Sequence, residues 1–285
     1  MSGVVQPGYA PPTGPDQPAA PRRRRWLLVV VVAWAVLLAA LTWLSVRDDP
    51  PTVREQRSLD QAGPVVDRAV GELVAAGGST AVMFPPQVDR GCRVTPFTDG
   101  ARLLRHVDVF VAEGAERELL ERVADRLPGG WRAGVRASAD GPLLRADAGE
   151  FVAVEGTAEE NGRVRLTADT GCRPYGTGYR EQPSGAPGTE GEALAGALRA
   201  LGGPAAPAVE RVTAPCPGGA ATAHSVRAVA GPAPQSPAAA LRPLAGGAPL
   251  LDTPQAYAYR AGAATVVADL TGDPPVLTAS TGCPA

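Results

Sequence analysis

The chain has 285 residues and a formal net charge of −2, from 27 basic and 29 acidic side chains. It contains no lysine and no isoleucine, and its one asparagine is Asn161. This usage is typical of GC-rich coding, so the abundance of arginine does not by itself indicate an anionic ligand. The near-neutral charge argues against a nucleic-acid-binding protein, which carries a basic footprint.

Residues 1–21 contain six prolines and no apolar periodicity, which predicts a disordered cytoplasmic tail. The proline spacing also fits a polyproline II segment for a proline-reading partner, but a solvated leader is the simpler interpretation.

Residues 26–46 carry no charged side chain. A helix of this length spans roughly 31 Å, the thickness of a bilayer core. Basic side chains precede this segment and indole rings lie near its ends: Arg22, Arg23, Arg24, Arg25, Trp26 and Trp43. The pattern predicts a signal-anchor transmembrane helix over 22–46, which contacts the lipid bilayer through residues 26–46 and has its N-terminus in the cytoplasm. A cleaved signal peptide is the alternative, but its apolar core is usually shorter, about 7–15 residues.

Residues 47–62 are predicted to be a juxtamembrane linker. From residue 47 onward the chain holds 23 arginines and 28 acidic residues, a net charge of −5. Long-range attraction alone would therefore not draw this part onto phosphate-rich polymers or lipids.

The sequence Leu166-Thr-Ala-Asp-Thr-Gly-Cys-Arg-Pro174 returns as Leu277-Thr-Ala-Ser-Thr-Gly-Cys-Pro284. In each copy an earlier cysteine follows an apolar helix pattern that ends in Gly-Gly, and His106 and His224 occupy what look like matching places. Self-similarity of this kind indicates a repeat. We expect an α+β fold with two tandem repeats, 63–174 and 189–285, that have antiparallel sheets and are joined by a linker over 175–188.

The first repeat is predicted to open with a helix over 64–76 and to continue with a strand over 107–112 and a second helix over 116–127. Strands over 131–138, 151–156 and 163–170 follow, the last two joined by an Asn161-Gly162 hairpin turn. The second repeat is predicted to open with a helix over 190–201, capped by a box of Thr189 and Glu192. Its inner helix begins at Ser236-Pro237 and is broken by Pro243. Few aromatic residues support this repeat, so we expect it to be the less stable one.

Two cysteines per repeat on the oxidising side of a membrane predict two disulfides, Cys92 with Cys172 and Cys216 with Cys283. By reducing the loop-closure entropy of the unfolded chain, each such bond is expected to stabilise the fold by roughly 4 to 5 kcal/mol. A zinc or copper site is the alternative, but the chain lacks the short Cys-x-x-Cys or His-x3-5-His pairs that such sites use. No metal site is predicted.

His106 and Asp108 would share a strand face as a base and its orienting group, yet no nucleophile motif accompanies them. The acidic cluster Glu155, Glu159 and Glu160 fits a solvated turn, and Gly176-Thr177-Gly178 fits the linker better than a phosphate-binding loop. No catalytic or cofactor-binding residue is therefore predicted. Arg132, Arg136, Arg163 and Arg165 would line one sheet face able to hold an anionic glycan or a peptide carboxylate, although a solvated face explains them as well.

These observations predict a protein of the bacterial cell membrane with one pass and extracytoplasmic C-terminal domains. We expect a non-enzymatic binding or accessory protein of the cell envelope that meets an envelope protein or wall ligand. One alternative is an extracytoplasmic hydrolase acting on envelope material, which would need a deep pocket with convergent His and Asp or Glu. The other is a structural or assembly component of an envelope complex.

Overall fold

The structure, a computed structural model, describes residues 21–48, 57–181, 188–203, 208–232, 234 and 236–284. The predicted disordered tail up to residue 20, residues 49–56 of the predicted juxtamembrane linker and residues 182–187 of the predicted inter-repeat linker lie outside these ranges. The chain divides into two compact units, Met1–Arg54 and Glu55–Ala285.

The helix of the first unit is α1 (Pro21–Asp48). Its segment Trp26–Trp43 is long and apolar enough to cross a membrane, and no part of that segment is buried. The predicted apolar helix is therefore present, with bounds slightly wider than expected.

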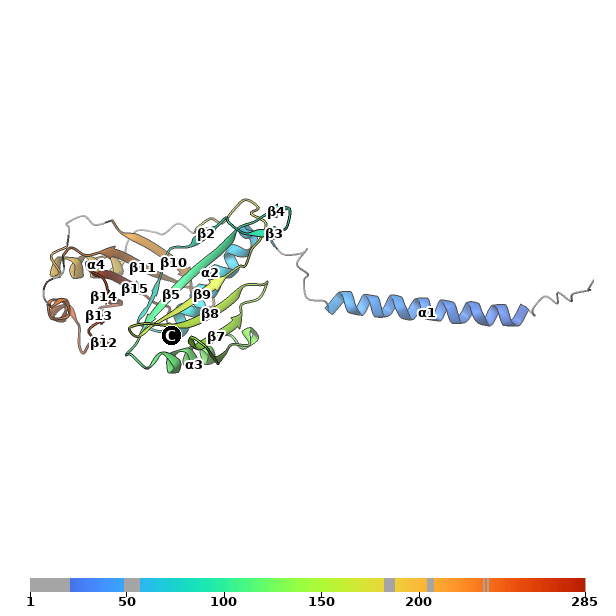
Figure 1. The fold of residues 1–285 in the computed structure, drawn as a ribbon, viewed down its shortest axis with the longest axis horizontal. Coiled ribbons are helices and arrows are strands. Elements are labelled where there is room, and N and C mark those ends of the chain that lie inside the picture. Colours follow the sequence, from blue (N-terminus) through green and yellow to red (C-terminus); the bar gives the residue numbers. More distant parts are fainter. Residues whose placement is uncertain are drawn as a thin grey trace, which may run out of the picture. The chain divides into compact units, whose positions relative to one another are not determined.

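Residues 55–285 form a mixed α+β unit with antiparallel sheets (Figure 1). The first sheet has the strand order β1-β5-β9-β8-β7-β6, and β2 also pairs with β5. A separate short hairpin is made by β3 and β4. The strands are β1 (Ala81–Met83), β2 (Gln87–Asp89), β3 (Arg93–Thr95), β4 (Thr98–Asp99), β5 (Arg102–Phe110), β6 (Gly134–Ser138), β7 (Gly141–Asp147), β8 (Ala153–Glu159) and β9 (Arg163–Asp169).

The second sheet has the strand order β10-β11-β15-β14-β13-β12, and every pairing in it is antiparallel. In both sheets the strand that comes last in the sequence, β9 or β15, lies inside the sheet. The strands are β10 (Glu210–Pro215), β11 (Thr222–Val229), β12 (Leu251–Asp252), β13 (Ala256–Ala261), β14 (Ala264–Asp269) and β15 (Val276–Thr281).

Helices cover one face of each sheet. On the first sheet, α2 (Leu59–Gly77) packs against β5 and β9, and α3 (Glu116–Arg126) packs against β6 and β7. On the second sheet, α4 (Thr189–Ala200) packs against β11, β14 and β15 and is joined by the short α5 (Pro237–Leu241). Leucines, valines and alanines fill both cores, and Tyr257 and Tyr259 add aromatic bulk to the second.

The two sheets share an interior, because α2 also packs against β10. Val212 and Ala214 of β10 belong to the same buried cluster as α2. The approach is closest at Gly71, where an added Cβ would lie 1.7 Å from the carbonyl oxygen of Pro215. The two halves therefore pack directly on each other.

The predicted helices are present, and the one predicted over 116–127 starts at Glu116 as expected, while others start at different residues. The first begins at Leu59 rather than at residue 64, because Ser58 and Gln61 form a capping box there. Pro64 lies inside this helix, on its exposed side. The predicted box of Thr189 and Glu192 is wrong, since the cap position is Gly188, whose amide donates to Oε1 of Glu190 at 3.0 Å. A short inner helix follows Ser236, as predicted, and Pro243 falls in a 3-10 turn that continues it.

The Asn161-Gly162 turn is confirmed. It lies in the three-residue loop between the paired residues Glu159 of β8 and Arg163 of β9, and its φ values of 65° and 68° are left-handed. Two strands start later than predicted. A 3-10 turn over Gly129–Trp131 delays β6, and positive φ at Glu150 and Phe151 delays β8. The strand β7 is not among the predicted elements.

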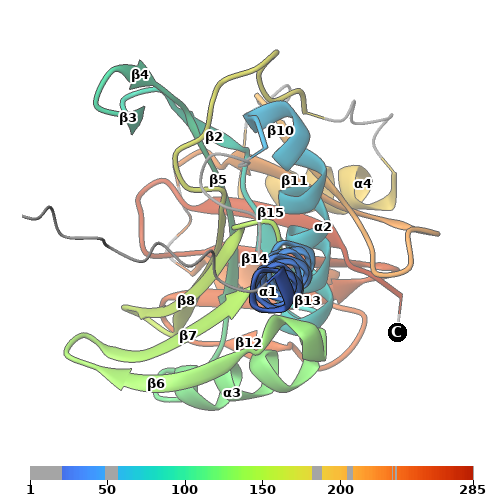
Figure 2. The ribbon, with the colours of Figure 1, turned by 90° about the vertical axis from the view of Figure 1, so that its right-hand side faces the viewer.

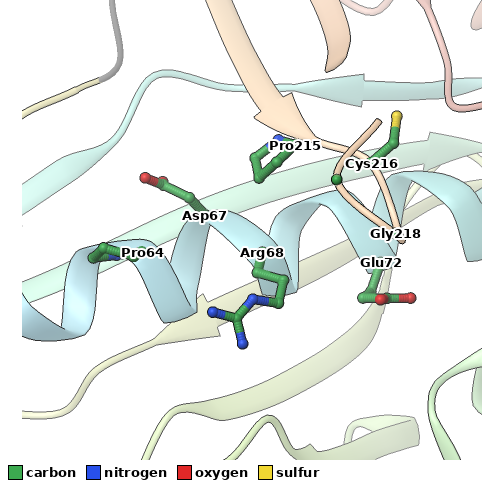
Figure 3. A pocket seen from close by; sticks show the side chains of 8 residues that line it. Pro64, Asp67, Arg68, Glu72, Pro215, Cys216 and Gly218 are labelled. Atoms are coloured by element: carbon green, nitrogen blue, oxygen red, sulfur yellow. The ribbon is translucent and has the colours of Figure 1, made fainter. Parts of the chain in front are cut away.

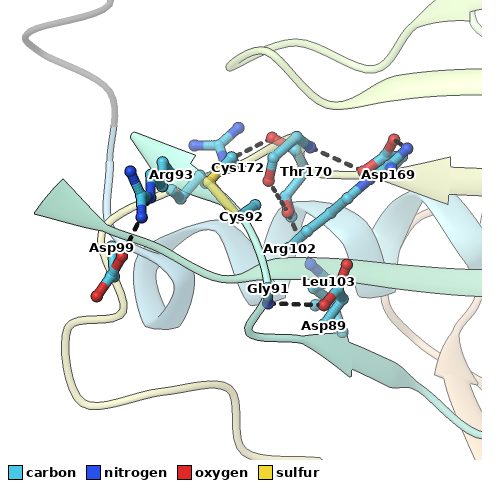
Figure 4. Close-up of a disulfide and its surroundings, with 12 residues drawn as sticks. Asp89, Gly91, Cys92, Arg93, Asp99, Arg102, Leu103, Asp169, Thr170 and Cys172 are labelled. Atoms are coloured by element: carbon cyan, nitrogen blue, oxygen red, sulfur yellow. Dashed lines mark hydrogen bonds and ion pairs between the residues drawn. A yellow bond between two sulfur atoms is a disulfide. The ribbon is translucent and has the colours of Figure 1, made fainter. Parts of the chain in front are cut away.

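Both disulfides join the predicted partners. The Cα atoms are 5.9 Å apart in Cys92–Cys172 (Figure 4) and 5.5 Å apart in Cys216–Cys283. Each bond connects the segment before β5 or β11 to the segment after β9 or β15. In both sheets the disulfide thus lies beside the second and third strands of the sheet order, β5 with β9 and β11 with β15.

Candidate functional site: a cleft along helix α2

Two cavities flank α2, and the first of them lies where the halves of the second unit meet. The first has a volume of about 370 Å³ and lies between α2 and the turn after β10 (Figure 3). The second has a volume of about 360 Å³ and lies between α2 and the segment after β9. Pro64 and Asp67 line both cavities, so we name the two together the α2 cleft. The first is lined by Pro64, Asp67, Arg68, Glu72, Pro215, Cys216, Gly218 and Gly219, and the second by Asp60, Gly63, Pro64, Asp67, Thr177, Gly178, Tyr179 and Arg180.

A buried polar network forms the floor of this cleft. Oδ1 of Asp67 accepts hydrogen bonds from Nη1 of Arg105 at 2.5 Å and from the hydroxyl of Tyr179 at 2.8 Å. Nη2 of Arg105 donates to the carbonyl oxygen of Thr213 in β10 at 3.0 Å. The Arg105 side chain is 1% exposed and that of Asp67 is 8% exposed. The network therefore ties α2, β5, β10 and the segment after β9 at one point.

This ion pair is placed in an apolar interior. Arg105 shares the helix-facing side of β5 with Leu103, Val107 and Val109, and all three of these are fully buried. Nε of Arg105 has no hydrogen-bond partner among the described residues. Removing two charges from water costs several kcal/mol per ion, and the attraction between them only partly offsets this. The Asp67–Arg105 pair therefore carries a desolvation cost that reduces the stability of the fold.

Ionisable groups on the cleft wall respond to their surroundings. Burial raises the pKa of the Glu72 carboxyl, and the neighbouring Arg68 opposes that rise. A hydrogen bond from Ser58 lowers the pKa of Asp60. Burial raises the pKa of the Tyr179 hydroxyl, and the adjacent Asp67 carboxylate adds to the rise. Tyr179 is therefore a protonated donor at neutral pH.

The wall opposite β10 comes from a segment that the sequence assigns to the linker. Pro174 accepts a hydrogen bond from the amide of Leu59, and the amide of Thr177 donates to Oδ1 of Asp60 at 3.3 Å. Gly176 and Gly178 have φ of 59° and 82°, which lets the chain turn back toward α2. The Gly176-Thr177-Gly178 segment thus shapes the second cavity through its close approach to the helix.

Three of the four arginines singled out from the sequence share a sheet face. Arg163 and Arg165 lie on β9, and the register carries the row from Arg165 through Thr157 and Leu143 to Arg136 on β6. Arg132 lies outside the strands, with a φ of 50°, and its Nη2 is 3.8 Å from Asp147.

Carboxylates already partner the arginines of β9. Arg165 donates to both oxygens of the fully buried Asp108, at 2.9 and 3.0 Å. Nη1 of Arg163 lies 3.6 Å from Asp269 of the second half. These two cations are thus balanced from within the fold, which weakens the case for an anion site there.

The hypothetical pair of His106 and Asp108 does not form. Nδ1 of His106 is hydrogen-bonded to the Thr167 hydroxyl at 3.0 Å, while Asp108 holds Arg165. Burial lowers the pKa of His106, and the charge of Arg165 lowers it further. The supposed match of the histidines is also wrong. His106 pairs with Thr167, five residues before Cys172, whereas His224 pairs with Thr281, two residues before Cys283.

All four cysteines are in disulfides, so no thiolate is available to a metal. Within the described ranges, no group of three or more His, Cys, Asp or Glu residues is arranged to hold an ion. Glu155 lies 3.1 Å from Arg145 on the neighbouring strand, and Glu159 accepts from the Thr157 hydroxyl at 3.3 Å. These glutamates therefore take part in the pairing of sheet side chains.

Comparison with protein-family models gives no match, and neither does comparison with curated protein sequences.

Proposed function

We propose that the protein is a single-pass membrane protein whose residues 55–285 lie on the extracytoplasmic side. The apolar helix Trp26–Trp43, of which no part is buried, supports the anchor, and Arg22 to Arg25 before it favour a cytoplasmic N-terminus. Two disulfides support an oxidising location for the second unit.

We further infer that the second unit arose by tandem duplication. The two sheets have the same order when strands are matched from β1 with β10 to β6 with β12. A helix precedes β1 in the first half and β10 in the second, and another helix follows β5 or its counterpart β11. The disulfides and the Thr-Gly-Cys sequences occupy the same topological place. Convergence on all of these features would need several independent coincidences.

The second unit is proposed to be a non-enzymatic binding module of the cell envelope, with an envelope protein or wall ligand docking in the α2 cleft. The Asp67–Arg105 pair on the cleft floor carries this proposal. A well-packed apolar pair would give comparable or greater stability, so stability alone does not account for these charges. Asp67 lines both cavities, so a ligand in either cavity could contact its carboxylate.

The polar groups that line the cleft, and that a ligand could contact, are carboxylates, guanidinium groups and one phenol. Its lining contains no histidine among the described residues, and its cysteine is bonded to another. His106 and Asp108 are occupied by Thr167 and Arg165. This chemistry favours recognition over hydrolysis.

A pair of substitutions at Pro64 tests the cleft. Pro64 is exposed and lines both cavities, so Pro64→Trp would obstruct them. Pro64→Ala is the matched control, because both variants restore the same backbone N–H to α2. The readout is photo-crosslinking in the native cells from benzoylphenylalanine at Arg68 in the cleft, with Arg117 on α3 as the control site.

We expect one reproducible adduct from position 68, retained with Pro64→Ala and lost with Pro64→Trp. Equal adducts from positions 68 and 117, or no adduct from position 68, would contradict binding in the cleft.

A further inference from the structure

The exposed aromatic residues of the second unit lie close in sequence to residues that are bonded to one buried side chain. Within its described residues, the exposed Phe, Tyr and Trp side chains are Phe97, Phe151 and Tyr175. Each lies within four residues of a group bonded to Arg173, or of Arg173 itself. Phe97 stands out, since it is 98% exposed.

Arg173 fixes this end of the unit. It is fully buried, and its guanidinium donates to the carbonyl oxygens of Arg57, Thr170 and Glu150. Its backbone forms a two-way bridge with Ala101, with N···O distances of 2.8 and 2.9 Å. Through these bonds the start of α2, the β7–β8 turn and the base of the β3–β4 hairpin are held together.

The β3–β4 hairpin presents Phe97 at its tip. The hairpin projects from the body of the unit (Figure 2), and the Cys92–Cys172 disulfide fixes its base (Figure 4). Thr95 accepts a hydrogen bond from the amide of Phe97 at 3.3 Å, which stabilises the turn. A braced hairpin that exposes an entire phenylalanine ring is suited to burying that ring in something outside the fold.

Arginines accompany the rings. Arg90 stacks on the Tyr175 ring at 4.5 Å and donates to its hydroxyl. Arg93 lies in β3, is 70% exposed and has its Nε 3.8 Å from Asp99. Arg57 is 57% exposed and has its Nη1 3.0 Å from Glu150. Aromatic rings and arginines together are typical of protein surfaces at the headgroup level of a bilayer, where the rings enter the interface and the guanidinium groups meet phosphates.

The chain itself brings this end toward a bilayer. Arg57, which Arg173 holds, is the first described residue of the second unit. Eight residues, 49–56, connect it to the end of α1 at Asp48. Such a segment spans at most roughly 30 Å when fully extended. The β3–β4 hairpin belongs to this same end of the second unit, because Arg173 is bonded both to Arg57 and to Ala101 at the base of the hairpin. A membrane within the span of residues 49–56 from Arg57 would therefore lie near the base of the hairpin.

We propose that this end of the second unit rests on the outer leaflet of the anchoring membrane, with Phe97 inserted among the lipid headgroups and Phe151 and Tyr175 beside them. This inference rests on the proposed membrane anchor. The net charge of −5 from residue 47 onward leaves little long-range attraction, so the rings and the short tether supply the contact.

The test uses the full chain in nanodiscs of phosphatidylcholine and phosphatidylglycerol. With both disulfides formed, a cysteine introduced by Thr98→Cys beside Phe97 is the one free thiol and carries an environment-sensitive fluorophore. Ala139→Cys places the same probe in the β6–β7 turn, at the opposite end of β7 from Glu150. Nitroxide-labelled lipids act as quenchers.

We expect quenching at position 98 to exceed that at position 139 at least threefold, and to fall to the level of position 139 when Phe97→Ser is added. Equal quenching at both positions, or no effect of Phe97→Ser, would overturn the membrane contact. Co-elution of the chain with the nanodiscs tests the anchor separately. A chain that does not co-elute refutes the anchor and this contact with it, whereas a retained chain with equal quenching refutes the contact alone.

Discussion

The closest approach between the two halves gives a sharp prediction at Gly71. An added Cβ would lie 1.7 Å from the carbonyl oxygen of Pro215 and 2.9 Å from its carbon, whereas ordinary contacts begin at 3.4 Å. Both groups are backbone, so α2 and β10 would have to separate by roughly half of that ordinary distance. Helix propensity alone predicts the opposite, a gain of about 1 kcal/mol for Gly→Ala.

Gly196 in α4 provides the matched control. There an added Cβ meets only Arg199 Nη2, at 4.0 Å. We expect Gly196→Ala to stabilise the unit by about 0.5–1 kcal/mol. Gly71→Ala should destabilise it by about 2 kcal/mol or more, since overpacking costs about 1–3 kcal/mol in side-chain cores and the backbone yields less.

The measurement is thermal unfolding of the full chain in micelles by circular dichroism, with both disulfides verified by mass. For a unit of this size 1 kcal/mol corresponds to about 2–4 °C. Gly71→Ala should thus lower the midpoint by about 4–8 °C, while Gly196→Ala raises it slightly. A Gly71→Ala midpoint at or above that of the unaltered protein would refute the packing of α2 on β10.

Three further outcomes are expected. Asp67→Asn leaves Arg105 uncompensated in the interior and should reduce the free energy of unfolding by about 3–5 kcal/mol in urea titration, and a loss below about 1 kcal/mol would contradict a buried pair. Tyr257→Phe and Tyr259→Phe should leave stability unchanged or raise it, because both hydroxyls are buried without a hydrogen-bond partner among the described residues and burial raises the pKa of Tyr259 to about 12; a loss above about 1 kcal/mol in the same titration would reveal a missing partner. The pKa of His106 is lowered in the fold, so the unfolded chain binds its proton first and stability should decline as the pH falls below 6.5. His106→Gln should flatten that decline between pH 6.5 and 5, and an unchanged slope would rule out this histidine as its source.

Local patterns predicted the parts of the fold that depend on local physics. The buried leucines and valines of α2 and α3 follow helical spacing, and Asn161-Gly162 needs only its own φ preferences. The strand β7 was not predicted, because Pro142, Leu143 and Leu144 follow one another and obscure the apolar-polar alternation of a half-buried strand.

The α2 cleft could not be predicted in the same way, because its residues meet only in three dimensions. Asp67, Arg105 and Tyr179 come from a helix, a strand and a supposed linker, and they join beside Thr213 of the other half. A signal was nevertheless present. Asp67 falls on the apolar face of its helix, and Arg105 falls among the inward positions of β5. Charged residues at positions that periodicity assigns to the core mark such a site.

The inner place of β9 and β15 has a consequence for how the protein is made. Synthesis delivers these strands last, yet without β9 the first sheet is two separate groups, β1 with β5 and β6 with β7 and β8. Without β15 the second sheet likewise separates into β10 with β11 and β12 with β13 and β14. An incomplete chain therefore exposes strand edges that are prone to aggregation. Because Cys172 and Cys283 follow these strands in the sequence, neither native disulfide can form before the last strand of its sheet has been synthesised.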